Sequence, residues 1–100
     1  MLNFNLEPET ERKLQRVLAS YTNKDTFFKN AIQYQISELK KEIININSDL
    51  KEFEVKNKMT SADFYAAFKD GKRGEEQDEI IWAGIYELQL KSKERLDALL

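Results

Sequence analysis

The stretch Leu2-Asn3-Phe4-Asn5-Leu6 alternates apolar and polar residues, and Glu7-Pro8-Glu9 follows it directly. Alternation with a period of two predicts a β-strand. The rest of the chain has helical patterns, so this strand has no partner within one copy, and its N–H and C=O groups need one. We therefore expect it to pair with the same strand of a second copy. Such a two-stranded ribbon turns its apolar side chains towards a core and leaves Asn3 and Asn5 on the opposite face.

The composition excludes several classes of protein. Of the 100 residues, 41% are hydrophobic and 34% are charged, and neither cysteine nor histidine is present. Thiolate chemistry, disulfides and the commonest general base are therefore excluded. No spacing indicates a catalytic acid–base pair or a phosphate-binding loop, so we expect no enzyme, no cofactor and no metal site. No apolar run approaches the ~20 residues of a membrane span, and no signal-peptide pattern is present, so we expect a cytoplasmic protein.

The net charge of −2 is unevenly distributed. Residues 1–45 carry seven basic and six acidic side chains, whereas residues 46–100 carry nine basic and twelve acidic ones. The first half is therefore only weakly basic. Any affinity for DNA must depend on a local patch that dimerisation doubles, because the overall field is weak.

Two helices are expected after the strand. Pro8 suits the first turn of a helix, because its missing N–H is not needed there, and an apolar stripe follows at Leu14, Val17, Leu18 and Tyr21. Asn23 or Asp25 can cap a second helix. That helix has apolar residues in a heptad pattern at Ile32, Ile36, Leu39, Ile43, Ile46, Leu50 and Phe53. The pattern predicts one long helix packed on its dimer mate. The alternative is a break at residues 45–49, because four of these five are poor helix formers: Asn45, Asn47, Ser48 and Asp49.

The C-terminal part predicts two more helices. One begins near Thr60-Ser61-Ala62-Asp63 and ends at Asp70-Gly71, and the other begins near Asp78, a plausible cap. The carboxylates of Glu75, Glu76, Asp78 and Glu79 between them are interpreted as a solvated charge cluster in a loop.

Residues 1–44 resemble the ribbon-helix-helix family of dimeric DNA-binding proteins, of the Arc, MetJ and CopG type. The resemblance depends on the alternating strand, the acidic and proline start of the first helix, the segment Leu14 to Ser20, and the opening Asn23-Lys24-Asp25-Thr26-Phe27-Phe28-Lys29 of the second helix. Met1 stands where the family usually has a basic residue, and Thr22 stands at the turn where it has glycine. The resemblance implies an intertwined homodimer that reads double-stranded operator DNA in the major groove.

The resemblance also assigns DNA-binding residues. It places Asn3 and Asn5 at base edges, where an asparagine amide makes bidentate bonds to adenine. Asn23 and Asp25 fill the polar position at the start of the second helix, which in the family contacts phosphate through Ser or Thr. An aspartate there repels phosphate unless it caps its own helix. Lys24 and Lys29 remain as expected phosphate contacts.

The C-terminal segment has an unusual density of aromatic and large aliphatic residues. From Met59 through Trp82 it resembles the C-terminal part of many small antitoxins, in which a helix starting M-[ST]-x-x-[ED]-F precedes an acidic, glycine-containing loop and a tryptophan helix. The resemblance implies that this segment binds a toxin, RelE/ParE-like or similar. The expected partner-binding residues are Phe64, Tyr65, Phe68, Ile81, Trp82 and Ile85. The alternative is that these residues form the core of a helical hairpin on the long helix.

The expected fold is mainly α: a ribbon-helix-helix dimer with a long second helix and a C-terminal two-helix tail. The expected segments are a DNA-binding and dimerisation domain at 1–45, a helical extension at 46–58 and a partner-binding segment at 59–100. The expected function is that of an antitoxin that represses its own operon and neutralises a cognate toxin. The alternatives are a stand-alone ribbon-helix-helix regulator and a helical homodimer that binds protein and no nucleic acid.

Overall fold

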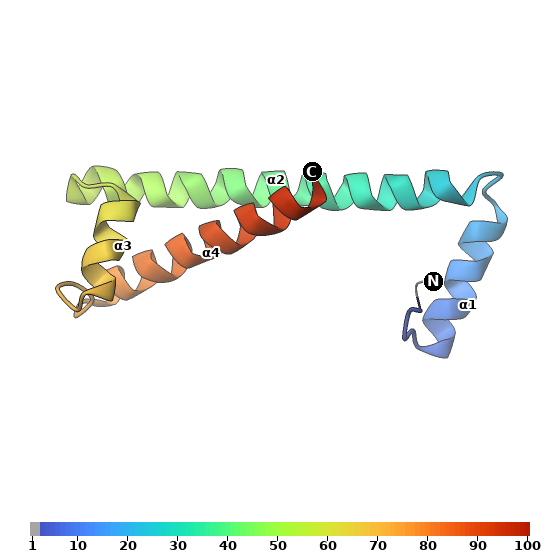
Figure 1. Cartoon of the computed structure of the whole chain (residues 1–100), viewed down its shortest axis with the longest axis horizontal. Coiled ribbons are helices and arrows are strands. Elements are labelled where there is room, and N and C mark those ends of the chain that lie inside the picture. Colours follow the sequence, from blue (N-terminus) through green and yellow to red (C-terminus); the bar gives the residue numbers. More distant parts are fainter. Residues whose placement is uncertain (1–2) are drawn as a thin grey trace. The chain divides into compact units, whose positions relative to one another are not determined.

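The computed structural model describes residues 3–100, and these residues form four α-helices joined by short connections (Figure 1). The helices are α1 (Pro8–Ala19), α2 (Lys24–Asn57), α3 (Ser61–Lys69) and α4 (Gln77–Leu99). The chain divides into two compact units, an N-terminal unit, Met1–Tyr34, and a C-terminal unit, Gln35–Leu100. Helix α2 contributes residues to both. The expected segments 46–58 and 59–100 lie together in the C-terminal unit.

The predicted β-ribbon is wrong, and with it the ribbon-helix-helix fold class. Residues 3–100 contain no strand, and residues 3–7 lead into α1 without regular structure. The Leu6 N–H donates to the Phe4 carbonyl at 2.9 Å, which bends the chain at Asn5. A β-ladder needs a neighbouring strand to supply the alternate donors and acceptors, and the described chain offers none. Leu2, the first residue of the predicted strand, lies outside the described residues.

The starts of α1 and α2 follow from local sequence. Pro8 is the first residue of α1, and the Glu9 carboxylate pairs with the Lys13 ammonium at 3.2 Å, one turn on. At the start of α2 the Asn23 Oδ1 accepts the backbone N–H of Asp25 at 2.9 Å. Of the two predicted caps of α2, Asn23 and Asp25, Asn23 is therefore the one that caps the helix. Asp25 lies in the first turn instead, and its carboxylate pairs with Lys29 at 3.3 Å.

Helix α2 is continuous over 34 residues, so the predicted single long helix is confirmed and the alternative of a break at 45–49 is wrong. Neither glycine nor proline interrupts it, and burial of one face outweighs the low helix propensity of its Asn and Ser residues. The buried members of its stripe are Ile36, Leu39, Ile43, Ile46 and Leu50. Ile46 and Leu50 pack in one cluster with Trp82 and Ala83 of α4. This part of the stripe is therefore covered by its own chain, not by a second copy.

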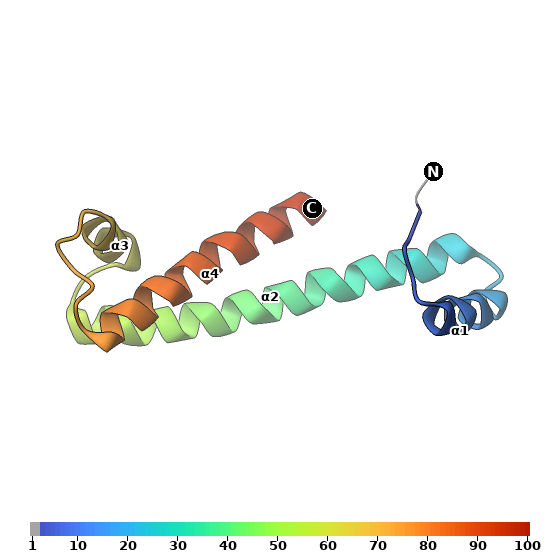
Figure 2. The same ribbon diagram turned by 90° about the horizontal axis from the view of Figure 1, so that it is seen from below.

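Helices α3 and α4 complete the C-terminal unit, in which α4 runs back in the direction opposite to α2 (Figure 2). Thr60 caps α3, because its side chain accepts the Asp63 N–H at 3.1 Å. Glu76 is the N-cap residue of α4, so the predicted cap at Asp78 is wrong. The Asp78 carboxylate instead pairs with the Lys56 ammonium at 3.4 Å and connects α4 to the end of α2.

Candidate functional site

The N-terminal unit does not bury its own apolar side chains. None of its described residues, 3–34, is buried, and only Leu14, Leu18 and Phe27 are half-buried. The large exposed apolar side chains of this unit are Phe4, Leu6, Val17, Tyr21, Phe28, Ile32 and Tyr34. Phe4, Leu6 and Phe28 lie together, since they line one hollow, and a cluster of exposed apolar side chains marks an interaction site in a soluble protein.

A hollow of about 320 Å³ lies within this surface. It is formed where the segment before α1 passes over α1 and the start of α2, and it is lined by Asn3, Phe4, Leu6, Glu11, Leu14, Gln15, Leu18 and Phe28. Phe4 is 55% exposed at its edge. The hollow is large enough to accept apolar side chains from outside the unit.

The five predicted DNA-binding residues are all exposed and all belong to the N-terminal unit. Asn3 and Asn5 lie before α1. The side-chain amide oxygen of Asn23 accepts the bond that caps α2, and Lys24 is the first residue of that helix. Lys29 pairs with Asp25, but a solvent-exposed pair of this kind contributes little and does not withdraw the ammonium from other contacts.

The C-terminal unit is centred on a stack of three aromatic rings. The Trp82 ring lies between Phe64, with centroids 3.8 Å apart, and Phe53, with centroids 5.6 Å apart, and the planes are within 10° of parallel. The Trp82 Nε1–H donates to the Ser61 Oγ at 2.9 Å. The Ser61 N–H in turn donates to the Glu54 carboxylate at 2.8 Å. The indole is therefore both packed and hydrogen-bonded, as a buried tryptophan requires.

The six predicted partner-binding residues fall into two groups. Phe64 and Trp82 are buried, at 0% and 1% exposure. Tyr65, Phe68 and Ile85 are half-buried and pack against the same cluster, and Ile81 alone of the six is exposed. The burial of Phe64 and Trp82 favours the alternative in which the aromatic residues form the core of a hairpin on α2.

An ion pair that the sequence interpretation missed holds the connection between α3 and α4. The Arg73 Nε donates to the Glu79 carboxylate at 2.5 Å, and the guanidinium lies 5.4 Å from the Phe64 ring centroid. The Gly74 N–H donates to the other Glu79 oxygen at 3.3 Å. The hydrogen bond from Arg73 lowers the pKa of Glu79 below its ordinary value. Glu79 is therefore not part of a solvated loop cluster, since it belongs to α4 and anchors the preceding loop.

Gly74 is required where it stands. Its φ is +121°, and a Cβ there would come within 2.8 Å of the Phe68 ring. The loop can therefore close over Phe68 only with glycine at this position. The signal available in the sequence was Arg73-Gly74 followed by Glu79, but a six-residue separation across a loop fits no helical or strand period.

Tyr65 connects two charged side chains on the surface of the C-terminal unit. Its hydroxyl donates to the Glu87 carboxylate at 2.7 Å, and the Lys69 ammonium lies 5.3 Å from its ring centroid. The contact with Tyr65 raises the pKa of Lys69. This group therefore keeps α3 and α4 together at the surface, and it has no neighbouring nucleophile or base to suggest chemistry.

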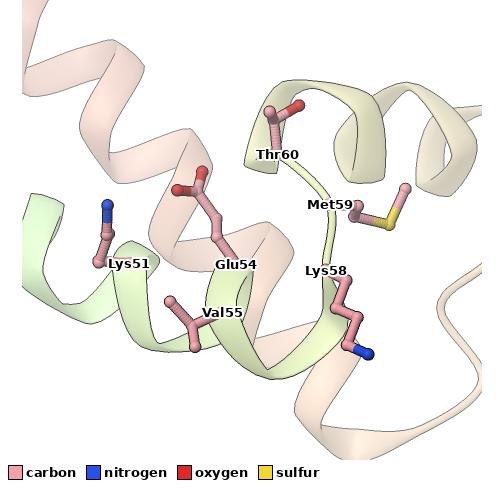
Figure 3. A pocket seen from close by; sticks show the side chains of 6 residues that line it. All are labelled: Lys51, Glu54, Val55, Lys58, Met59 and Thr60. Carbon is pink, nitrogen blue, oxygen red and sulfur yellow. The ribbon is translucent and has the colours of Figure 1, made fainter.

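A shallow hollow of about 330 Å³ lies at the junction of α2 and α3 (Figure 3). Its lining is Lys51, Glu54, Val55, Lys58, Met59 and Thr60. Glu54 and Thr60 are already engaged with the start of α3. The hollow is consequently part of the capping arrangement of α3 and brings no catalytic group together.

Comparisons with known proteins add no assignment. No family model matches the chain, and searches of curated proteins and of solved structures give no match. Within residues 3–100, no cluster of three carboxylates is placed to hold a metal ion. Over the same range, no helix has the length and apolar character needed to cross a bilayer.

Proposed function

We propose that the chain is an antitoxin-type regulator: a homodimer whose N-terminal unit contacts operator DNA and whose C-terminal unit binds a toxin protein. The observation that carries the proposal is the N-terminal unit, which has no buried side chain among its described residues yet exposes seven large apolar ones. A unit of this size is unstable without burial of its apolar face. A second copy of the same surface supplies that burial.

DNA contact is assigned to the exposed polar and basic residues of the same unit. Asn3 and Asn5 carry the base-reading amides, and Lys24, at the first turn of α2, contributes phosphate affinity together with free backbone N–H groups. Dimerisation places two copies of this weakly basic set on one duplex. Residues of the N-terminal unit therefore act together as dimer surface and DNA surface.

Toxin binding is assigned to the C-terminal unit. Residues 63–79 carry six carboxylates against three basic side chains. A toxin that acts on nucleic acid needs a basic surface, and an acidic segment complements it. Because Phe64 and Trp82 are core residues, contact runs through Ile81 and the half-buried Tyr65, Phe68 and Ile85 unless the unit opens.

A stand-alone regulator is the second candidate. It is supported by the burial of Phe64 and Trp82, which gives the C-terminal unit a core of its own and no need for a partner. The two candidates share the dimer and the DNA contact. They differ only in whether a second protein binds the C-terminal unit.

The dimer is tested by light scattering on the full chain at micromolar concentration. Phe4→Asp places a charge at the edge of the hollow, and Phe4 is half exposed in one copy, so a single chain loses little. We expect the wild type to be dimeric and Phe4→Asp to be monomeric with reduced helix content, because the charge would be buried in the dimer and the N-terminal unit is unstable without its partner. Gln33→Asp, at an exposed polar position of the same unit, is the matched control and should remain dimeric. A monomeric wild type would refute the proposal.

The DNA and toxin contacts have separate tests. In gel shifts on the DNA upstream of its own gene, Asn5→Ala should weaken specific binding by ~1–3 kcal/mol, and Lys24→Ala should weaken binding to all DNA equally. Absence of any shift at low salt excludes the DNA role. Co-expression with the product of the neighbouring reading frame tests the toxin: relief of growth arrest supports the antitoxin, and no effect favours the stand-alone regulator.

A further inference from the structure

A polar hollow of about 420 Å³ lies within the C-terminal unit, between α2, the start of α3 and α4. Two of its lining residues, Leu50 and Ser61, are only 3% and 2% exposed, so the hollow reaches down to the core of the unit. Sites for small ligands in proteins have volumes of about 300–1,000 Å³. The hollow is therefore large and deep enough to hold a small molecule.

Two opposite charges line this hollow, the Glu54 carboxylate and the Lys93 ammonium. Neither forms an ion pair with any side chain of residues 3–100, although Lys51 and Lys58 are only three and four residues from Glu54. Glu54 is half-buried, and its Oε2 accepts the Ser61 N–H at 2.8 Å, whereas its Oε1 has no such partner. Charge removed from water costs free energy that an opposite charge offsets. The hollow is therefore complementary to a ligand with a cationic and an anionic end.

The helix geometry limits the distance between the two charges. The Gln89 Nε2 donates to the Asn47 Oδ1 at 2.6 Å, so these residues lie at the same level of the antiparallel helices α2 and α4. Glu54 is seven residues beyond Asn47, towards α3, and Lys93 is four residues beyond Gln89, in the opposite direction. At 1.5 Å per residue their backbones are about 16 Å apart along the helix axes. Each side chain tilts towards the N-terminus of its own helix, which for both means towards the other.

This distance selects the length of the ligand. The charged ends are closer than the backbones, yet farther apart than the ~4 Å of an ion pair. A free α-amino acid carries both of its charges on one carbon atom and cannot reach both ends of the hollow. An extended peptide spans about 3.3 Å per residue, so two or three residues cover about 7–10 Å. A peptide of that length has its terminal charges at a suitable separation.

Groups that can bond to a peptide backbone lie on the walls between the two charges. Beyond the bond that joins them, the Asn47 amide still offers its N–H donors and Gln89 its carbonyl oxygen. The Tyr86 hydroxyl also lacks a partner among residues 3–100, and Tyr86 is half-buried in the lining. A peptide backbone presents donors and acceptors alternately. The walls therefore favour a peptide over an aliphatic chain that carries the same two charges.

We propose that this hollow binds a short zwitterionic peptide of two or three residues, with its N-terminal ammonium on Glu54 and its C-terminal carboxylate on Lys93. The site lies entirely within the C-terminal unit, so it does not depend on the proposed antitoxin function. A ligand there contacts α2, α3 and α4 together, and it stabilises the folded unit because the site does not exist in the unfolded chain.

Nuclear magnetic resonance titration of the full chain with triglycine tests the site. Triglycine has no side chains, so only its two terminal charges and its peptide groups can bind. We expect saturable shifts of the side-chain amide signals of Asn47 and Gln89. N-acetyl-triglycine lacks the ammonium and triglycine amide lacks the carboxylate, so each should bind at least tenfold more weakly. No saturable shift at millimolar triglycine, or equal affinity for the three probes, would overturn the proposal.

Two variants test the assignment of each end. Glu54→Gln keeps an oxygen for the Ser61 N–H but loses the charge, so it should bind triglycine only as weakly as the acetylated probe and should bind that probe unchanged. Lys93→Met should likewise lose its preference for triglycine over the amide. Lys91→Met removes an exposed lysine of α4 that does not line the hollow, and it should bind all three probes as the wild type does. If Glu54→Gln and Lys93→Met weaken all three probes alike, the assigned contacts are wrong.

Discussion

Replacement of Trp82 by alanine tests whether the aromatic stack is the core of the C-terminal unit. Trp82 is 1% exposed and lies between Phe53 and Phe64, and its indole N–H is bonded to Ser61. Truncation of a buried tryptophan costs about 3–5 kcal/mol through lost burial and the cavity left behind. This loss of stability already includes the lost ring stacking and the lost hydrogen bond to the Ser61 hydroxyl. Since a whole protein is stable by only about 5–15 kcal/mol, we expect Trp82→Ala to unfold most of the unit.

The assay is urea denaturation followed by far-ultraviolet circular dichroism, because the variant has no tryptophan to report by fluorescence. Trp82→Phe keeps an aromatic ring and loses the hydrogen bond, so it should lose clearly less than Trp82→Ala. Ile80→Ala is the control on the same helix; Ile80 is 56% exposed, and its loss should change stability by under ~0.5 kcal/mol. If Trp82→Ala has the midpoint of the wild type, the stack is not the core, and the indole is available as a partner anchor.

Three further predictions concern the loop and the start of α2. Gly74→Ala should destabilise the protein by ~2–3 kcal/mol, because its φ of +121° is essentially restricted to glycine and the Phe68 ring must move. In thermal melts the control Gly71→Ala should cost only ~1 kcal/mol of stability, because its φ is +75° and the space around it is open. The pKa of Glu79 is lowered in the folded state, so the stability that this carboxylate contributes is present above its unfolded pKa and is lost as pH falls through the folded pKa. In denaturation measured at successive pH values, Glu79→Gln should therefore be less stable than the wild type at neutral pH, and its stability should depend less on acid. Asn23→Ala removes the cap of α2 and should cost ~1 kcal/mol of stability, and a wild-type melting curve for this variant would contradict the capping role.

Local sequence signals predicted the helices well. Pro8, the Asn23 cap and the Thr60 start each satisfy backbone groups within a few residues, so their effect does not depend on distant parts of the chain. The long helix was predicted by its heptad stripe, because apolar residues spaced three and four apart lie on one face of a helix. What the stripe could not reveal is its partner, because Ile46 and Leu50 suit a neighbouring α4 as well as a second copy.

Non-local features were missed or misjudged. A strand is defined by what it pairs with, so alternation in residues 2–6 could not by itself establish one. Trp82 was assigned to a partner surface because an aromatic density read from sequence does not distinguish a core from an interface. The Arg73–Glu79 pair joins residues across a loop at no regular spacing, so nothing in the sequence distinguishes the carboxylate of Glu79 from a solvated one. The predicted DNA-binding and partner-binding roles remain predictions.

The continuity of α2 has a consequence for the order in which the chain acquires structure. Starting a helix is the unfavourable step, and extending an existing one is nearly neutral. The buried stripe from Ile36 to Leu50 holds α2 in the C-terminal unit, whereas residues 24–34 contain no buried side chain. We therefore expect the C-terminal unit to serve as the nucleus from which these residues extend, and backbone amides along α2 should exchange with solvent progressively faster towards Lys24. Part of the surface proposed for dimerisation would therefore form last, at the N-terminal end of a helix that the C-terminal unit has already started.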